Sequence, residues 1–232
     1  VEPSDSDECR RFVKESFELS EQFDTPVIVR LSTRVSHSQS IVETEERKGD
    51  EVKVYEKNPR KYVMMPAFAR DRHVFVEERM IKLREFAETS SLNKIEINNG
   101  KIGIITSGIA YQYAKEVFGG SVSYLKLGIV NPLPVKLIKD FAEKFDTVYV
   151  IEELDDIIET HCRKIGVDVK GKEIFGFTGE LSQAIIAEKI LGKKTEFTDF
   201  EEQVPGRPPV MCAGCPHRGI FYVLSKNKIT VS

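Results

Sequence analysis

Two cysteines near the end of the chain stand at a spacing that can bind a metal. Cys212 and Cys215 enclose two residues, and two thiolates at this separation on a turn can hold one side of a zinc ion or of an iron–sulfur cluster. Either centre needs about four ligands, so a complete site would require Cys162 or His161 to fold back onto this turn. The spacing favours a metal half-site and a tight turn with two packed cysteines about equally.

A polar loop earlier in the chain holds a cation that could bind an anion. Residues 32–38 contain Arg34 and His37, and they follow an apolar, β-branched stretch over 26–31 that predicts a strand. A guanidinium binds a carboxylate through two parallel hydrogen bonds, and open α/β sheets bind ligands where their strands end. From the residues alone, an ordinary surface loop is still the favoured interpretation.

Two further strand ends carry polar residues. Glu152 and Glu153 follow a predicted strand over 147–151, but neighbouring residues on an extended chain point in opposite directions, which argues against a shared acid–base pair. Ser107 and Gly108 follow another predicted strand and could present backbone N–H groups to an anion. A single glycine is more typical of a plain strand-to-helix turn.

The first third of the chain is predicted to be helical at both ends. Apolar residues at helical spacing predict a helix over 4–23, capped by Ser4 or Ser6, and a second charged helix over 73–92. Between these helices, residues 43–61 are rich in both charges, and we expect an exposed strand and linker there.

The rest of the chain alternates between strand and helix patterns. The Asn98-Asn99-Gly100 sequence favours a hairpin between strands over 94–97 and 101–106. Alternation after this point predicts a parallel sheet with helices on both faces. The further helices are expected over 108–118, 131–145, 154–165, 180–191 and shortly after 216, the further strands over 122–127, 147–151, 173–177 and 228–231, and a proline-rich linker over 195–209.

Composition excludes several classes of protein. The 232 residues hold 34 Lys and Arg against 37 Asp and Glu, a net charge of -3, which argues against a generally basic nucleic-acid-binding protein. With 41% hydrophobic residues the chain can bury a core, and apolar runs such as 102–105 are far too short to span a membrane. Four cysteines and no recognisable signal peptide lead us to expect a reduced, cytoplasmic protein.

Several short motifs together resemble one known family. They span nearly the whole chain in the family's order and include residues 2–6, 26–30, 33–37, 103–108, 131–134, 148–154 and 212–218. The chain is similar to the middle of the large (alpha) subunit of the indolepyruvate branch of the 2-oxoacid:ferredoxin oxidoreductases, which are thiamine-diphosphate enzymes. No single motif is decisive, but the combination is specific.

The resemblance implies a domain map. Residues 1–48 would be the end of a pyrimidine-binding thiamine domain, 49–94 a linker and helix, 95–192 a transketolase C-terminal-like domain, and 207–232 the start of a pyrophosphate-binding thiamine domain. The implied fold is α/β: a three-layer, parallel-sheet transketolase C-terminal-like domain flanked by partial thiamine-diphosphate-binding α/β domains. The family's motifs that activate the cofactor and hold Mg2+ would lie outside the chain, so we expect the isolated chain to be inactive.

The same resemblance implies an activity. Enzymes of this kind oxidatively decarboxylate aryl pyruvates such as indolepyruvate with coenzyme A, and they yield the aryl-acetyl-CoA, CO2 and reduced ferredoxin. The implied cofactors are thiamine diphosphate, Mg2+ and [4Fe-4S] clusters. The implied partners are a smaller beta subunit, ferredoxin, the 2-oxoacid and coenzyme A, with no nucleic acid and no membrane.

Candidate site residues also follow by similarity. Arg34 matches the arginine that related enzymes use on the 2-oxoacid carboxylate, and His37 would be a neighbour that shapes the site; both are predicted to be catalytic. Cys212 and Cys215 match a pair that holds a cluster near the cofactor, and they are predicted as metal ligands. Three alternatives stay open: a non-catalytic scaffold domain of a related oxidoreductase, a zinc-binding module at the two cysteines, and the same enzyme with another 2-oxoacid.

Overall fold

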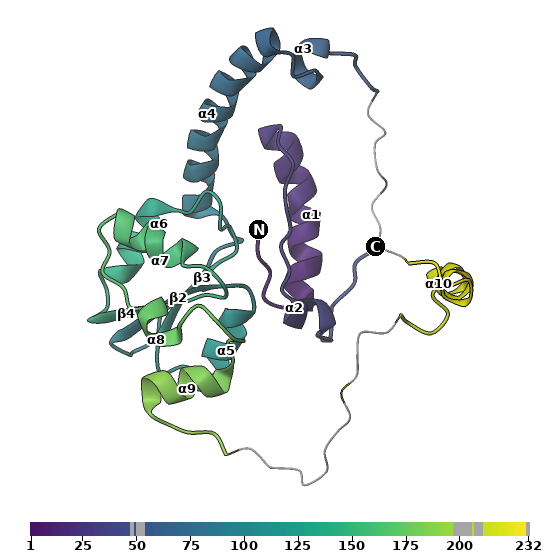
Figure 1. Ribbon diagram of the computed structural model, residues 1–232. Helices are drawn as coiled ribbons and strands as arrows, with labels where there is room; N and C mark the ends of the chain where they lie inside the picture. The colour runs from purple at the N-terminus through teal and green to yellow at the C-terminus, as the bar shows by residue number, and fades with distance from the viewer. Residues whose placement is uncertain (47–48, 50–53, 197–205, 207–210, 231–232) are drawn as a thin grey trace. The chain divides into compact units, whose positions relative to one another are not determined.

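The computed structural model describes residues 1–46, 49, 54–196, 206 and 211–230 (Figure 1). It divides into two compact units, Val1–Thr195 and Glu196–Ser232. Most of the proline-rich linker predicted over 195–209 lies outside the described residues, as does residue 231 of the strand predicted over 228–231. Residues 228–230, which are described, form a turn and coil and no strand.

A four-stranded sheet forms the centre of the first unit. The strands β1 (Lys94–Glu96), β2 (Ile102–Ser107), β3 (Ser123–Leu127) and β4 (Thr147–Ile151) lie in the order β1-β3-β2-β4. Strand β2 is parallel to both β3 and β4, whereas β1 is antiparallel to β3. The predicted α/β fold with a mostly parallel sheet is confirmed at this level.

The hairpin predicted around Asn98-Asn99-Gly100 is wrong, because β3 lies between β1 and β2. The backbone N–H of Asn98 donates to Ser123 Oγ at 2.8 Å, and the Asn98 amide donates to the Val122 carbonyl at 2.7 Å. These bonds fasten the loop to the start of β3. A Cβ at Gly100 would lie 2.2 Å from the Ser121 carbonyl oxygen, so this glycine marks a close approach of two backbones and not a two-residue turn.

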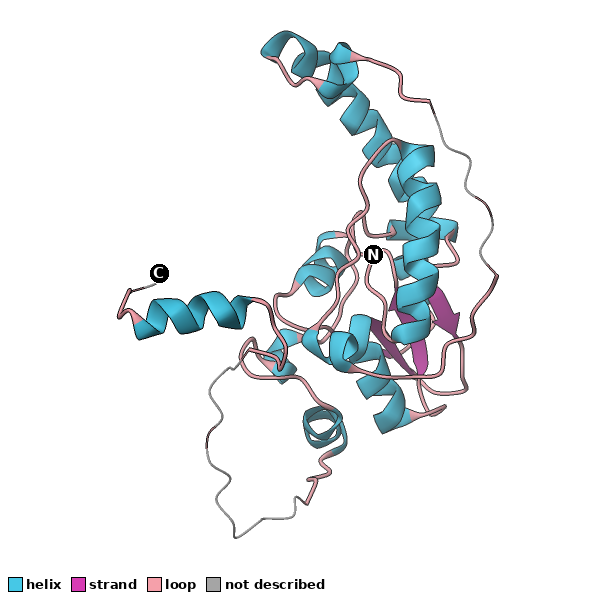
Figure 2. Ribbon diagram, turned by 90° about the vertical axis from the view of Figure 1, so that its right-hand side faces the viewer, coloured by secondary structure: helices cyan, strands magenta, loops and turns pink. Residues whose placement is uncertain are grey.

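Helices cover both faces of the sheet, as predicted. Helices α5 (Gly108–Phe118) and α9 (Gln183–Leu191) pack on the face that carries Ile104, and α6 (Val135–Ala142) and α7 (Ile157–Lys164) pack on the face that carries Ile105 (Figures 1 and 2). These two neighbouring isoleucines are both fully buried. Successive side chains of a strand point to opposite faces, so each supports a separate layer of the core.

The stretches over 26–31 and 173–177, both predicted to be strands, are not strands either. Residues 26–31 are extended, but among the described residues they pair with no strand. Their backbone bonds to Val1: the Val1 amino group donates to the Ile28 carbonyl at 2.8 Å, and the Arg30 N–H donates to the Val1 carbonyl at 2.9 Å. The stretch over 173–177 instead forms a helical turn, α8 (Lys172–Phe175). The polar loop over 32–38 is also partly helical, as α2 (Thr33–His37).

The remaining helices lie largely where the sequence predicts them. Helix α1 (Ser6–Phe23) is capped by Asp5, whose side chain accepts from the Glu8 N–H at 2.8 Å, and by neither Ser4 nor Ser6. Helix α4 (Pro66–Thr89) begins seven residues earlier than expected, with a proline in its first turn. The other two helices are α3 (Pro59–Tyr62), in the charged stretch where we expected a strand, and α10 (His217–Lys226) in the second unit.

Candidate functional site

Arg34 lies in α2 and forms a two-point ion pair with Glu180. Its Nη2 donates to Glu180 Oε2 at 2.7 Å, and its Nε donates to Glu180 Oε1. The two residues are 146 positions apart in the sequence, and 61% of the arginine side chain and 54% of the glutamate side chain are exposed. The structure thus places the predicted carboxylate-binding arginine in the fork geometry expected of it, with a carboxylate of the same chain as the partner.

Both residues line a cavity of about 820 Å³. Its walls come from residues 30–34, the end of β4, α8, the segment that follows α8, and α9. Three cations and three carboxylates face it together with several apolar side chains. The charged residues are Arg30, Arg34, Lys172, Glu152, Glu153 and Glu180, and the large apolar ones are Leu31, Leu154, Phe175, Phe177, Leu181 and Ile185.

A second cavity, of about 290 Å³, lies at the carboxyl ends of β2 and β4. The chain leaves β2 for α5 on one face of the sheet and leaves β4 for α7 on the other face. This divergence makes a crevice where open α/β sheets bind ligands. Residues Arg30 and 152–154 line both cavities, so the two cavities share one wall.

The side chain of Glu2 fills part of this crevice. Its carboxylate accepts from Ser107 Oγ at 2.8 Å and pairs with Arg30 Nε at 2.9 Å. Its backbone N–H donates to the Gly128 carbonyl at 2.8 Å. A carboxylate therefore lies beside the turn between β2 and α5, where the sequence suggested an anion site, and the Ser107 hydroxyl donates its hydrogen bond to that carboxylate.

Glu152 and Glu153 have different surroundings, although both line the two cavities. The Glu152 carboxylate accepts from the N–H groups of Ile158 and Glu159 at 2.8 and 2.9 Å, so it caps the start of α7. Burial raises the pKa of Glu152. Burial also raises the pKa of Glu153, and the nearby charge of Arg30 opposes that rise. Glu152 therefore has a structural role, and only Glu153 offers a carboxyl group free of a helix cap.

His37 lies at the end of α2, is exposed, and is not among the residues that line either cavity. The structure thus brings Arg34 into the cavity wall and leaves His37 outside it.

In the second unit, the Cys215 N–H donates to the Cys212 carbonyl at 3.1 Å, and Cys215 Sγ lies 3.4 Å from His217 Nδ1. This is the tight turn that the cysteine spacing suggested.

The described residues do not complete a metal centre. Among them, no group of three or more His, Cys, Asp or Glu side chains is arranged to hold a metal ion. Cys162 belongs to α7 and is fully buried, and burial raises the pKa of its thiol to about 12. Its thiol is thus part of the core of the first unit, where it serves as a small apolar residue.

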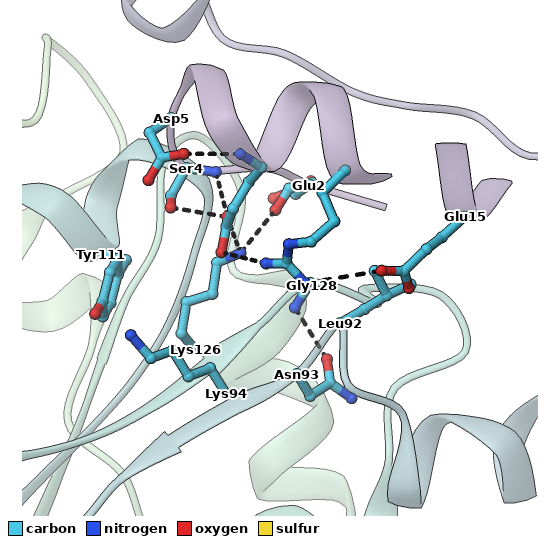
Figure 3. Close-up of polar contacts among 12 residues, drawn as sticks. Glu2, Ser4, Asp5, Glu15, Leu92, Asn93, Lys94, Tyr111, Lys126 and Gly128 are labelled. Carbon is cyan, nitrogen blue, oxygen red and sulfur yellow. Dashed lines mark hydrogen bonds and ion pairs between the residues drawn. The ribbon is translucent and has the colours of Figure 1, made fainter. Parts of the chain in front are cut away.

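Sequence analysis missed a buried ion pair that fixes α1 against the sheet. Figure 3 shows Lys126 of β3 extending toward the start of α1, near Ser4. Lys126 is fully buried, and its Nζ pairs with Glu8 and lies 4.6 Å from the centre of the Phe12 ring. Burial alone would raise the pKa of Glu8, but the charge and hydrogen bond of Lys126 and two hydrogen bonds from Ser4 together outweigh it and lower that pKa. One lysine within the apolar run of β3 was the available signal.

Within the described ranges, no helix is both long and apolar enough to cross a membrane. No family model matches the chain. A search of solved structures finds a likeness to a 2-oxoglutarate:ferredoxin oxidoreductase from Magnetococcus marinus, with a TM-score of 0.43 and 16% identity over 56% of this chain and 24% of that one.

Sequence comparison with curated proteins gives longer matches. The chain is 36% identical to the indolepyruvate oxidoreductase subunit IorA of Methanothermobacter marburgensis, over 96% of this chain and 39% of the relative. The same subunit of Pyrococcus horikoshii is 33% identical over 97% of the chain and 39% of the relative, and that of Archaeoglobus fulgidus is 33% identical over 97% and 40%. The chain is thus homologous, over nearly its whole length, to about two fifths of the IorA subunit of indolepyruvate oxidoreductases.

Proposed function

We propose that the chain forms part of the large subunit of an oxidoreductase that converts an aryl pyruvate and coenzyme A into the aryl-acetyl-CoA, CO2 and reduced ferredoxin. One observation carries this proposal: identity of 33–36% to IorA subunits over 96–97% of the chain. The relatives are named for indolepyruvate, so this is the 2-oxoacid we propose. A smaller beta subunit and ferredoxin are the proposed partners, and the cytoplasm is the proposed location.

Within this proposal, Arg34 binds the carboxylate of the 2-oxoacid. The ion pair with Glu180 supports the role, because it shows that both donors of the fork can reach one carboxylate at the edge of the large cavity. Apolar side chains near the fork, including Leu154 and Phe177, offer a surface for an aryl group. We assign no step to His37, because it does not line the cavity.

The crevice at the carboxyl ends of β2 and β4 does not fit thiamine diphosphate. A diphosphate needs backbone N–H donors and a bound cation, but the crevice at the ends of β2 and β4 carries the carboxylates of Glu2, Glu152 and Glu153. We therefore derive no step through the cofactor. We propose that thiamine diphosphate and Mg2+ are held by parts of the large subunit beyond the matched stretch. For a [4Fe-4S] cluster, Cys212 and Cys215 would supply two of the ligands.

A chimera tests the proposed function. This chain replaces the matching stretch of the IorA subunit from Methanothermobacter marburgensis, and the chimera is produced together with the partner subunit of that organism. We expect coenzyme A-dependent reduction of a viologen dye with indolepyruvate, and an aryl-acetyl-CoA product in the mass spectrum.

A second chimera serves as the control for the junctions, with the matching stretch taken from the Pyrococcus horikoshii subunit. The proposal fails if the control is active while the first chimera assembles normally but does not reduce the dye with any 2-oxoacid. It also fails if the control assembles and the first chimera does not, because this chain would then not be equivalent to the stretch it replaces.

A further inference from the structure

The partner of Arg34 is itself a carboxylate, presented in the geometry a substrate carboxylate would take. Glu180 Oε2 lies 2.7 Å from Nη2, and Oε1 accepts from Nε of the same guanidinium. An arginine has one such fork on this edge, so one carboxylate can occupy it at a time. More than half of each side chain is exposed, so a solute can reach the pair directly.

Glu180 lies on a short, irregular connection between two helices. Residues 176–182 connect α8 to α9 and contain no helix or strand. Gly176 and Gly179 have φ angles of 74° and 85°, which glycine adopts without the strain that other residues would meet. No heavy atom lies within 4 Å of the place where a Cβ would stand on either glycine. Residues 176–180 are exposed, so they can move without repacking the core, whereas Leu181 packs against it.

We propose that Glu180 is an internal competitor for the carboxylate-binding fork of Arg34, and that a 2-oxoacid binds by displacing it. This inference rests on the proposed role of Arg34. The binding-competent state is the one in which residues 176–180 have swung away, so the apparent affinity for a substrate falls by the fraction of time that the fork is free. Glu180 is a positioning residue in this scheme, since it acts through Arg34 and not on the substrate.

The expected effect is modest because the pair is exposed. Exposed ion pairs shift equilibria by about two- to fivefold, so Glu180→Gln should lower the KM for the 2-oxoacid in the chimera by about that factor and leave kcat unchanged. Glu180→Asp keeps the charge and should restore most of the original KM. A purely structural role would change stability or kcat and would not separate KM from kcat in this way.

Glu173→Gln is the matched control. Glu173 belongs to α8 and pairs with Arg163 at 2.7 Å, with 51% and 52% of the two side chains exposed. It does not line the large cavity. Its replacement removes an ion pair of similar exposure on the neighbouring element, and the KM for the 2-oxoacid should stay unchanged.

Hydrogen exchange on the chain itself gives a second readout that does not depend on turnover. We expect indole-3-acetate, a stable aryl carboxylate, to speed exchange over residues 176–182, whereas the neutral indole-3-acetamide has no effect. In Arg34→Gln the segment should already exchange fast and should not respond. No response to the carboxylate at millimolar concentration, or an equal response to the amide, overturns the inference.

The two readouts separate this inference from the proposed function. A carboxylate-specific response of the chain together with an inactive chimera would refute the function and leave the competition at Arg34 standing. An active chimera whose KM is unmoved by Glu180→Gln would refute the competition and leave the function standing.

Discussion

Replacing Lys126 with methionine should destabilise the chain far more than replacing Arg11 with methionine, although both cations pair with Glu8. Lys126 is fully shielded from solvent on β3, and Glu8 is 11% exposed. Arg11 lies one turn along α1 from Glu8, at 3.5 Å, with 40% of its side chain exposed. The comparison holds the Glu8 carboxylate constant and changes the burial of its partner, and the second ion pair of Arg11, with Glu15 at 3.8 Å, is also partly exposed.

The magnitude follows from what each change leaves behind. Methionine at 126 leaves the Glu8 carboxylate buried without its main partner, and removing one half of a buried pair costs about 3–5 kcal/mol. An exposed pair three residues apart on a helix contributes about 0.2–0.5 kcal/mol. In a chain of 232 residues the first change should lower the Tm by roughly 6 to 20 °C, and the second by about 2 °C or less.

Urea denaturation of the two single variants, followed by circular dichroism, measures both costs. The double variant Lys126→Met with Glu8→Gln should recover part of the loss, because no charge is then left buried. The reasoning is refuted if Lys126→Met costs no more than Arg11→Met, or if the double variant is destabilised as much as Lys126→Met alone.

Three further outcomes are expected. Glu88→Ala should lower stability by about 1–2 kcal/mol in urea denaturation, because the Glu88 carboxylate accepts the first three N–H groups of α6 at 2.7 to 2.9 Å; the exposed Glu85→Ala on the same helix should change it by less than about 0.5 kcal/mol. In the native chain Cys162 should stay unreactive toward a thiol reagent while Cys212 reacts within minutes, and equal rates would contradict the burial. Partial burial would raise the pKa of Glu96, but three hydrogen bonds outweigh it and lower that pKa to about 2. The ionised Glu96 therefore adds about 1–2 kcal/mol, after screening, to the free energy of unfolding above pH 4.5, and this contribution is lost between pH 4.5 and 2. Glu96→Gln should flatten this pH dependence in a series of urea midpoints.

Local patterns predicted most of the elements in the second half of the chain. The adjacent Ile104 and Ile105 lie in a run that is apolar on both sides, as a central parallel strand requires. The end of α1 was also predictable, because Pro26 disfavours a helical conformation at the residue before it. In the structure the helix ends at Phe23, and Asp24 adopts a left-handed conformation with φ of 51°. Such patterns involve residues that are close in the sequence, so they predict the structure correctly wherever local interactions determine it.

Pairings between distant segments could not be read in this way. The Asn98-Asn99-Gly100 sequence has the composition of a tight turn, but its side chain and backbone bonds go to Val122 and Ser123, some 25 positions away. The sequence contains no mark of that partner. The apolar stretch over 26–31 has the residues of a strand, but among the described residues it pairs with no strand and bonds to the backbone of Val1.

At the candidate site, too, pairings between distant residues could not be predicted from the sequence. Arg34 was singled out by the resemblance to a known family, because from the residues alone an ordinary surface loop was the favoured interpretation. Its actual partner, Glu180, lies 146 positions away on a segment where we had predicted a helix. The pair of Glu8 and Lys126 spans 118 positions, and neither residue indicates the other. Ion pairs of this kind depend on the tertiary fold, which must be known before they can be found.

The most direct test of the central claim is the KM of the chimera for indolepyruvate after Arg34→Lys. Lysine keeps the positive charge but loses the planar fork that binds both carboxylate oxygens. We expect the KM for indolepyruvate to rise about tenfold or more while the KM for coenzyme A stays unchanged. An unchanged KM for indolepyruvate would contradict the account, because Arg34 would then not be the residue that binds the 2-oxoacid carboxylate.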